Sequence, residues 1–179
     1  MAEKYVLTNS RGDNLQVSKK FVYSCNVFKN MFEDLGEDTR EELLELPITD
    51  MHDFGILKEF TDFFEILDNL SMENELGDTM TLLEYFDKYF SENENELAKN
   101  YFHKNIEFPH SNKLVEMYGN YKLITFLNMN RFFDNVKITK AICVCIVCFI
   151  TKIQNQGEKA NLEESKEVDN MINKILEAI

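Results

Sequence analysis

Apolar and polar residues alternate along two short segments near the N-terminus. Tyr5 and Leu7 precede, and Leu15 and Val17 follow, a polar segment that contains Gly12. Alternation with a period of two is typical of half-buried strands, and glycine can adopt the positive φ of a tight turn. We therefore predict a β-hairpin over residues 5–17, followed by a first helix in the segment Lys19–Ser24.

Three further elements are predicted between Val27 and Phe64. The first is a short amphipathic helix, and an acidic loop follows it. The second is a strand over Leu43–Leu46, which Pro47 stops because proline has no N–H for a sheet hydrogen bond. The third is a long helix that Thr49 or Asp50 can cap. The apolar residues of the two helices repeat at the spacing of a buried face: Val27, Phe28, Met31, Phe32, Phe54, Leu57, Phe60 and Phe64.

The composition changes after Leu67. Residues 68–78 are rich in acids and asparagine and contain a glycine, so we predict a loop there. An apolar stripe at helical spacing returns at Thr79, is interrupted over Glu92–Glu96 and then resumes, which predicts two short helices. Aromatic residues on these helices and on the long helix before them are predicted to be core, with a groove for a partner as the alternative.

Further helices are predicted toward the C-terminus. One covers Asn112–Tyr118 and ends at Gly119, and another covers Lys122–Phe133. An apolar helix through Ala141–Ile150 then ends near Gly157. Asn161 can cap a last amphipathic helix, whose apolar face must pack against the chain or a partner.

Composition narrows the classes of function. The length of 179 residues suits one domain, and 44% hydrophobic residues indicate a globular chain. With 19 basic and 32 acidic residues the net charge is −13, which disfavours nucleic acid and anionic membranes as partners. The N-terminus lacks a secretory signal pattern, and the longest apolar run is shorter than the roughly 20 residues that a bilayer needs. We therefore expect a cytoplasmic and nuclear protein.

Candidate chemistry is sparse. Cys143, Cys145 and Cys148 could bind zinc, but they lack paired C-x2-C units and lie among apolar residues, so we interpret them, with Cys25, as buried hydrophobes. No nucleophile elbow, zinc-protease or phosphate-loop motif occurs, and acidic pairs such as 33–34 and 41–42 are interpreted as a solvated face. We therefore expect a protein that is not an enzyme and has no metal or cofactor.

Two blocks of sequence resemble a known family. The first contains VFKNMFEDLGED, LELP and ILKEFTDFFE within residues 27–65, and the second is KLITFLNMNRFFDNVKITKAICVCIVCFI, Lys122–Ile150. In order and spacing both resemble the Skp adaptor of cullin and F-box ubiquitin ligases, whose family includes elongin C and the BTB/POZ domains. The resemblance implies an α+β, BTB/POZ-like fold in which helices cover a small three-stranded sheet. It divides the chain into an adaptor domain, 1–153, with a family-divergent helical insertion at 68–110, and a C-terminal amphipathic helix, 154–179.

The resemblance also implies two binding surfaces. Arg131 and Phe132 occupy the places of an Asn-Tyr pair on the family's cullin-facing side, so the aromatic is retained and the asparagine is replaced by a cation. Asn128 and Asn130 stand where the family has Leu and Ala. The positions expected to face the receptor, including four on the C-terminal helix, are apolar: Leu123, Leu127, Cys143, Ile146, Phe149, Ile150, Val168, Met171, Ile172 and Ile175.

The function that these expectations imply is that of a non-enzymatic adaptor. It would bridge the N-terminal domain of a cullin and an F-box-like substrate receptor in an E3 ubiquitin ligase, with no nucleic acid or membrane partner. The alternative is a BTB-like scaffold that self-associates as a homodimer, or a one-sided mimic that occupies one interface without ligase function.

Overall fold

The computed structural model describes residues 4–35, 44–45, 54–73, 76–100 and 108–155. Over these residues the protein is mixed α+β and mostly helical, with two small sheets. The elements follow in this order: β1 (Lys4–Thr8), β2 (Asn14–Ser18), α1 (Lys19–Ser24), α2 (Asn26–Leu35), β3 (Leu44–Glu45), α3 (Phe54–Asn69), β4 (Ser71–Glu73), β5 (Thr79–Thr81), α4 (Leu82–Asn100), α5 (Ser111–Phe133) and α6 (Val136–Asn155).

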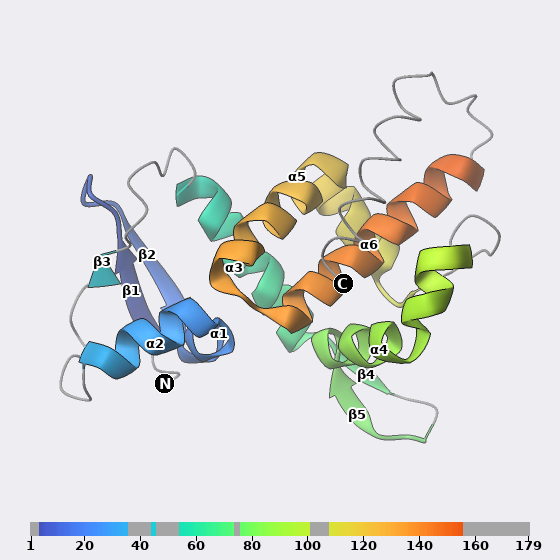
Figure 1. The fold of residues 1–179 in the computed structure, drawn as a ribbon, viewed down its shortest axis with the longest axis horizontal. Coiled ribbons are helices and arrows are strands. Elements are labelled where there is room, and N and C mark those ends of the chain that lie inside the picture. Colours follow the sequence, from blue (N-terminus) through green and yellow to red (C-terminus); the bar gives the residue numbers. More distant parts are fainter. Residues whose placement is uncertain (1–3, 36–43, 46–53, 74–75, 101–107, 156–179) are drawn as a thin grey trace.

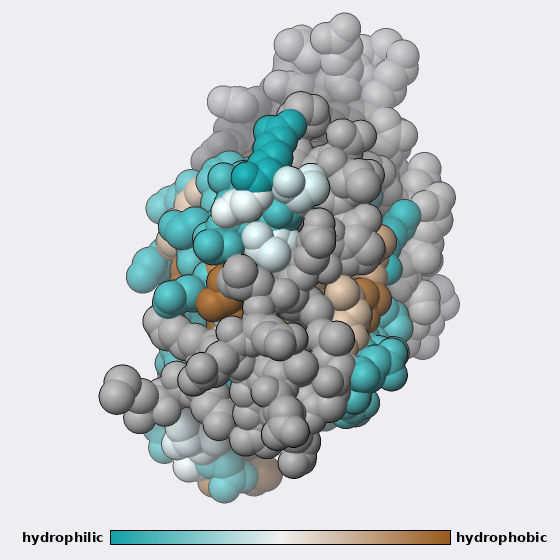
Figure 2. Space-filling view, turned by 90° about the vertical axis from the view of Figure 1, so that its left-hand side faces the viewer, coloured by the Kyte–Doolittle hydropathy of each residue, from teal (hydrophilic) through white to brown (hydrophobic). Residues whose placement is uncertain are grey.

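The elements form a sheet at one side and a group of helices beside it (Figure 1). The sheet of β1, β2 and β3 lies with α1 and α2 at one end of the molecule, and α4 with the β4–β5 hairpin lies at the other. In the view onto the sheet end, most of the coloured side chains are hydrophilic, and the hydrophobic ones lie in small separate patches (Figure 2).

The three-stranded sheet has the order β2-β1-β3. β1 and β2 are antiparallel, with Tyr5 opposite Val17, and β3 runs parallel to β1 with Leu44 opposite Leu7. Gly12 has a φ of 82° in the turn, and the apolar residues of both strands are buried on one face. The predicted hairpin is thus confirmed, as is a strand within the predicted range 43–46, whose end residues lie outside the described part.

The first two helices follow the hairpin directly, as predicted. The Ser18 hydroxyl caps α1 by accepting a hydrogen bond from the Phe21 N–H at 3.1 Å. Cys25 separates α1 from α2, and α2 buries Phe28 and Phe32. The predicted amphipathic helix is therefore confirmed.

Helix α3 carries the aromatic centre of the core. Its described part begins at Phe54, so the predicted caps Thr49 and Asp50 lie outside the described residues. The Phe60 ring is fully buried and lies with its centroid 5.9 Å from those of Phe21 and Phe133. The interpretation of this aromatic stripe as core is confirmed.

The prediction of a loop over residues 68–78 is wrong over residues 68–69, which belong to α3, and over residues 71–73, which form a strand. Helix α3 continues to Asn69, and β4 then pairs antiparallel with β5, with Met72 opposite Met80. Each strand has three residues, too few for a recognisable alternation, and Gly77 supplies the turn with a φ of 82°. The Leu82 N–H closes the hairpin by donating to the Leu70 carbonyl at 2.8 Å.

Helix α4 begins with a reciprocal cap and contains a kink. The Thr81 hydroxyl accepts from the Glu84 N–H at 3.2 Å, and the Glu84 carboxylate accepts from the Thr81 N–H at 2.9 Å. This is a capping box. At Asn93 the backbone leaves helical geometry, with φ −122° and ψ 17°, which confirms the predicted break within Glu92–Glu96.

Helices α5 and α6 complete the core. Gly119 interrupts α5 with φ 65° and ψ 175°, so the two predicted helices on either side of it are confirmed as segments of one kinked element. Helix α6 is buried along residues 141–148 without a break, which makes it the central helix. It is described as far as Asn155; residues 156–179, with the predicted C-terminal helix, lie outside the described part.

Three ion pairs join helices across the surface. Lys20 on α1 pairs with Asp68 on α3 at 2.6 Å, and Lys122 on α5 pairs with Glu59 on α3 at 2.7 Å. Lys140 on α6 donates to Asp87 at 2.8 Å and to Ser91 at 2.7 Å, both on α4. The exposed pair of Lys122 and Glu59 contributes about 0–1 kcal/mol, and together the pairs fix which helix faces meet.

Candidate functional site

The corner between α5 and α6 is built by two residues with capping roles. Asp134 ends α5 in the left-handed conformation, with φ 54°, and its N–H donates to the Asn130 carbonyl at 2.7 Å. Aspartate tolerates this conformation better than most residues. Asn135 then starts α6, because its side-chain oxygen accepts from the Ile138 N–H at 3.1 Å. The sharp corner therefore follows from local hydrogen bonds.

The corner is attached to the junction of α1 and α2. The Asn135 amide donates to the Ser24 hydroxyl at 3.0 Å, and the Asn26 amide donates to the Asp134 carboxylate at 2.9 Å. Below these bonds the Phe28 and Phe133 rings stack with centroids 4.5 Å apart. The junction of α1 and α2 is thus fixed to the corner between α5 and α6.

Asn130 is a buried polar residue beneath the corner. It is 0% exposed, and its amide donates to the Asn135 carbonyl at 2.7 Å and to the Thr139 hydroxyl at 2.6 Å. Its own side-chain oxygen accepts no hydrogen bond from the described part of the chain. The sequence showed only a polar residue where the family has Ala, whereas Asn128, its neighbour, is exposed.

Exposed side chains surround this corner. Phe132 is 47% exposed and contacts Phe133 edge to face, with centroids 5.4 Å apart. Arg131 is also exposed, as is Val136 at the start of α6. We call Arg131, Phe132 and Val136 the corner surface. Aromatic and arginine side chains on a rigid part of the backbone are typical of protein-binding hot spots.

The residues expected to face a receptor lie elsewhere. Leu123, Leu127, Cys143 and Ile146 are at most 1% exposed and belong to the core that α5 and α6 share. Phe149 is partly buried. The side chain of Ile150 and the whole of Val168, Met171, Ile172 and Ile175 lie outside the described residues. Their contact with a receptor stays a prediction.

The four cysteines are buried and reduced, as their interpretation as hydrophobes requires. Burial raises the pKa of Cys143 and Cys148 to about 12 and that of Cys25 to about 11, and it also raises the pKa of Cys145. A thiol must lose its proton to attack a substrate or bind a metal. Within the described ranges, no group of three or more His, Cys, Asp and Glu side chains has the arrangement of a metal site.

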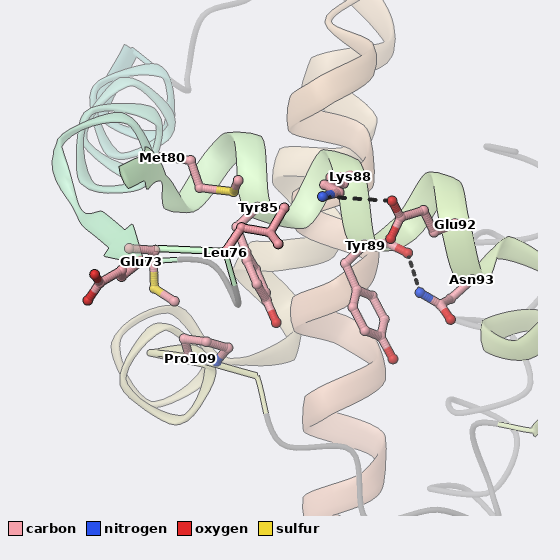
Figure 3. A pocket seen from close by; sticks show the side chains of 10 residues that line it. Glu73, Leu76, Met80, Tyr85, Lys88, Tyr89, Glu92, Asn93 and Pro109 are labelled. Carbon is pink, nitrogen blue, oxygen red and sulfur yellow. Dashed lines mark hydrogen bonds and ion pairs between the residues drawn. The ribbon is translucent and has the colours of Figure 1, made fainter. Parts of the chain in front are cut away.

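A pocket lies in the insertion, a second place where side chains converge (Figure 3). It has a volume of about 560 Å³ and lies between the β4–β5 hairpin, α4 and Pro109. In Figure 3 Tyr85 and Tyr89 leave α4 on the same side, with Glu73 on the hairpin and Glu92 on α4 at opposite ends of the row. Of the aromatic residues predicted to be core on α4, Phe86 and Phe90 are buried, whereas Tyr85 and Tyr89 line this pocket, as the alternative of a groove allows. The sequence did not show the pocket's other walls, because three separate segments form it.

Comparison with protein-family models, curated proteins and solved structures found no match. Among the helices that the structure describes, none combines the length and the apolar character needed to cross a membrane.

Proposed function

We propose that this chain has a BTB/POZ-like fold and acts as a non-enzymatic adaptor of the Skp and elongin C type. It would join the N-terminal domain of a cullin to an F-box-like substrate receptor in an E3 ubiquitin ligase. The observation that carries this proposal is the exposure of Phe132, beside Arg131, at a corner fixed to the first helices.

The order of the elements supports the fold part of the proposal. A hairpin, two helices, a strand that returns to the same sheet and a long helix follow one another, and the three-stranded sheet is packed against helices. Both sequence blocks that carry the resemblance contribute to one core, because Phe28 and Phe60 from the first contact Phe133 from the second. The two blocks therefore pack together in one domain, as the resemblance to a single fold requires.

The rigidity of the corner supports the part of the proposal in which the corner surface binds a cullin. Hydrogen bonds from Asn135 to Ser24 and from Asn26 to Asp134 hold Phe132 in a fixed position relative to α1 and α2. A partner that contacts both parts would meet a surface that needs little ordering on binding. Such an interface buries roughly 1,200–2,000 Å².

A one-sided mimic is the second candidate, and the burial of the receptor-facing positions favours it. Leu123, Leu127, Cys143 and Ile146 are covered, so a receptor that contacts them must displace the side chains that cover them. A mimic would bind the cullin through the corner surface and recruit no receptor. A self-associating scaffold would instead use the surface for a second copy of the chain.

Calorimetric titration with the N-terminal domain of a cullin from the same organism tests the proposal. We expect one-to-one binding that Phe132→Ala weakens by about tenfold or more, as for a hot-spot residue. The control is Tyr121→Ala, since Tyr121 is 78% exposed on the same helix but lies before the corner by three turns. Absence of binding at tens of micromolar, or equal loss with both variants, would reject cullin docking through the corner.

A second titration separates the two candidates. An F-box domain from the same organism is added to the cullin-bound protein. Simultaneous binding of both supports the adaptor, whereas cullin binding without F-box binding supports the one-sided mimic.

A further inference from the structure

Different faces of helix α4 contact the core, helix α6 and the pocket. Leu82, Phe86 and Phe90 are buried in the core, and Asp87 faces Lys140 of α6. The pocket receives a third set at positions i, i+3, i+4 and i+7: Tyr85, Lys88, Tyr89 and Glu92. Residues at this spacing form one continuous stripe, so α4 presents a complete wall to the pocket.

The wall is aromatic at its centre. The rings of Tyr85 and Tyr89 are stacked at an interplanar angle of 24°, with centroids 6.4 Å apart. Phe108 packs edge to face against Tyr89, with ring centroids 4.6 Å apart. Both tyrosines are only partly buried, and Figure 3 shows their rings side by side. A cation can lie against such rings and is attracted by their electron-rich faces.

Charge around the pocket is complementary to a cation. Glu73 and Glu92 line it, and Lys88, the one cation among the described lining residues, is engaged with Glu92 at 4.0 Å. Residues 68–110 contain ten Asp and Glu against three Lys, so this quarter of the chain carries more than half of the net charge of −13. The field here attracts basic groups.

The opposite wall is apolar. Met72 and Met80 are partners across the hairpin and line the pocket together with Leu76, which is 83% exposed. Methionine adapts its shape to an apolar ligand group. The volume of about 560 Å³ falls within the range of ligand-binding pockets. Free inorganic cations would use the carboxylates and leave this wall without a function.

We propose that this pocket binds a basic segment of a partner protein. An arginine or lysine of that segment lies along Tyr85 and Tyr89 between Glu73 and Glu92, and a neighbouring apolar side chain packs against the two methionines. The inference is independent of the adaptor proposal, because none of these residues belongs to the corner surface or to the receptor-facing positions.

The probe is a short fluorescein-labelled peptide of alternating arginine and leucine, titrated with the full chain by fluorescence anisotropy. Two matched pairs of variants test the pocket, because Lys88–Glu92 on α4 and Lys29–Glu33 on α2 are both exposed i, i+4 pairs, with distances of 4.0 and 3.9 Å. Glu92→Gln is expected to weaken binding about threefold and Lys88→Glu to tighten it about threefold. Glu33→Gln and Lys29→Glu are expected to change it by less than about 1.5-fold.

Each other outcome rejects the proposal. Equal effects of the two pairs would mean that the peptide responds to the overall charge alone. Equal affinity for a peptide with glycine in place of leucine would exclude the apolar wall. Sedimentation that detects a dimer in wild type and a monomer in Lys88→Glu would assign the pocket to a second copy of the chain. A circular dichroism spectrum of Lys88→Glu that matches that of wild type excludes misfolding as the source of a gain in affinity, so this variant keeps the test decisive.

Discussion

The frame, residues 4–67 and 111–155, and the pocket side of the insertion are held together in different ways. In the frame, hydrogen bonds join Asn26 to Asp134 and Ser24 to Asn135, across 108 and 111 positions of sequence. Along the pocket wall the hydrogen bonds and ion pairs are local, as between Lys88 and Glu92 and between Tyr89 and Asn93, whereas another face of α4 is joined to α6 through Lys140.

How much it costs to change each surface depends on whether its contacts join distant segments or lie within one helix or hairpin. A contact between distant segments forms only when the whole frame is folded, so its loss lowers the stability of the entire frame. A contact within one helix or hairpin can be lost while the rest stays folded. The hydrogen-bonded corner that positions Arg131 and Phe132 is therefore costly to change, whereas the pocket can change its lining at little cost to the fold.

The largest effect is expected where the two sequence blocks meet. Phe133→Ala removes a fully buried ring that stacks on Phe28 and Phe60, so we expect a loss of about 3–5 kcal/mol in the free energy of unfolding. Its neighbour Phe132 is 47% exposed, and Phe132→Ala should cost less than about 1 kcal/mol. Urea unfolding followed by circular dichroism measures both. Equal costs would contradict the assignment of Phe133 to the core and Phe132 to the surface.

A smaller effect is expected from the buried polar contacts of the corner. Asn135→Ala removes the cap on Ile138 and the donor to Ser24, so we expect a loss of about 2 kcal/mol. Asn128→Ala is the control, because Asn128 is exposed on α5, and it should change stability by less than about 0.5 kcal/mol. A near-neutral Asn135→Ala would show that the corner is held by packing alone.

Sequence signals were sufficient where local chemistry decides the structure. Alternation around Gly12 predicted the first hairpin, and Gly119 and the polar run over Glu92–Glu96 predicted the two helix breaks. In each case the residue that changes the backbone is itself visible in the sequence. The threonine–glutamate spacing of the capping box at α4 was also visible, and it would have placed the start of that helix.

Features that depend on distant partners could not be predicted in this way. The spacing of Leu123, Leu127, Cys143 and Ile146 marks an apolar face but does not say whether the chain or a partner covers it. The burial of Asn130 also could not be predicted, because its acceptors, Asn135 and Thr139, meet its amide only once the chain has turned from α5 into α6. The β4–β5 hairpin was missed because its strands are short and polar.

The smallest effect is expected when one helix cap is removed in each region. Ser18 caps α1 in the frame and Thr81 caps α4 in the insertion, so Ser18→Ala and Thr81→Ala remove the same kind of hydrogen bond, worth about 1 kcal/mol. Hydrogen exchange should separate them. We expect Ser18→Ala to increase exchange across the frame, and Thr81→Ala to increase it in α4 and the β4–β5 hairpin while frame amides stay protected. Uniform changes in both variants would show that the insertion and the frame unfold as one unit.

The Glu84 carboxylate in the cap of α4 makes the stability of this helix depend on pH. Hydrogen bonds from Thr81, first from its backbone N–H, lower the pKa of Glu84 below its ordinary value of 4.5. A carboxyl whose pKa is lower in the folded state stabilises that state above its unfolded pKa, and this contribution is lost as the pH falls through the folded pKa. The exchange protection of α4 in wild type should therefore be full at pH 6 to 7 and decrease as the pH falls below 4.5. Thr81→Ala keeps the backbone N–H at position 81, so its protection should decrease over the same pH range. Glu84→Gln keeps a capping-box side chain without a charge, so an equal loss of protection at low pH in Glu84→Gln would exclude the carboxylate as the source.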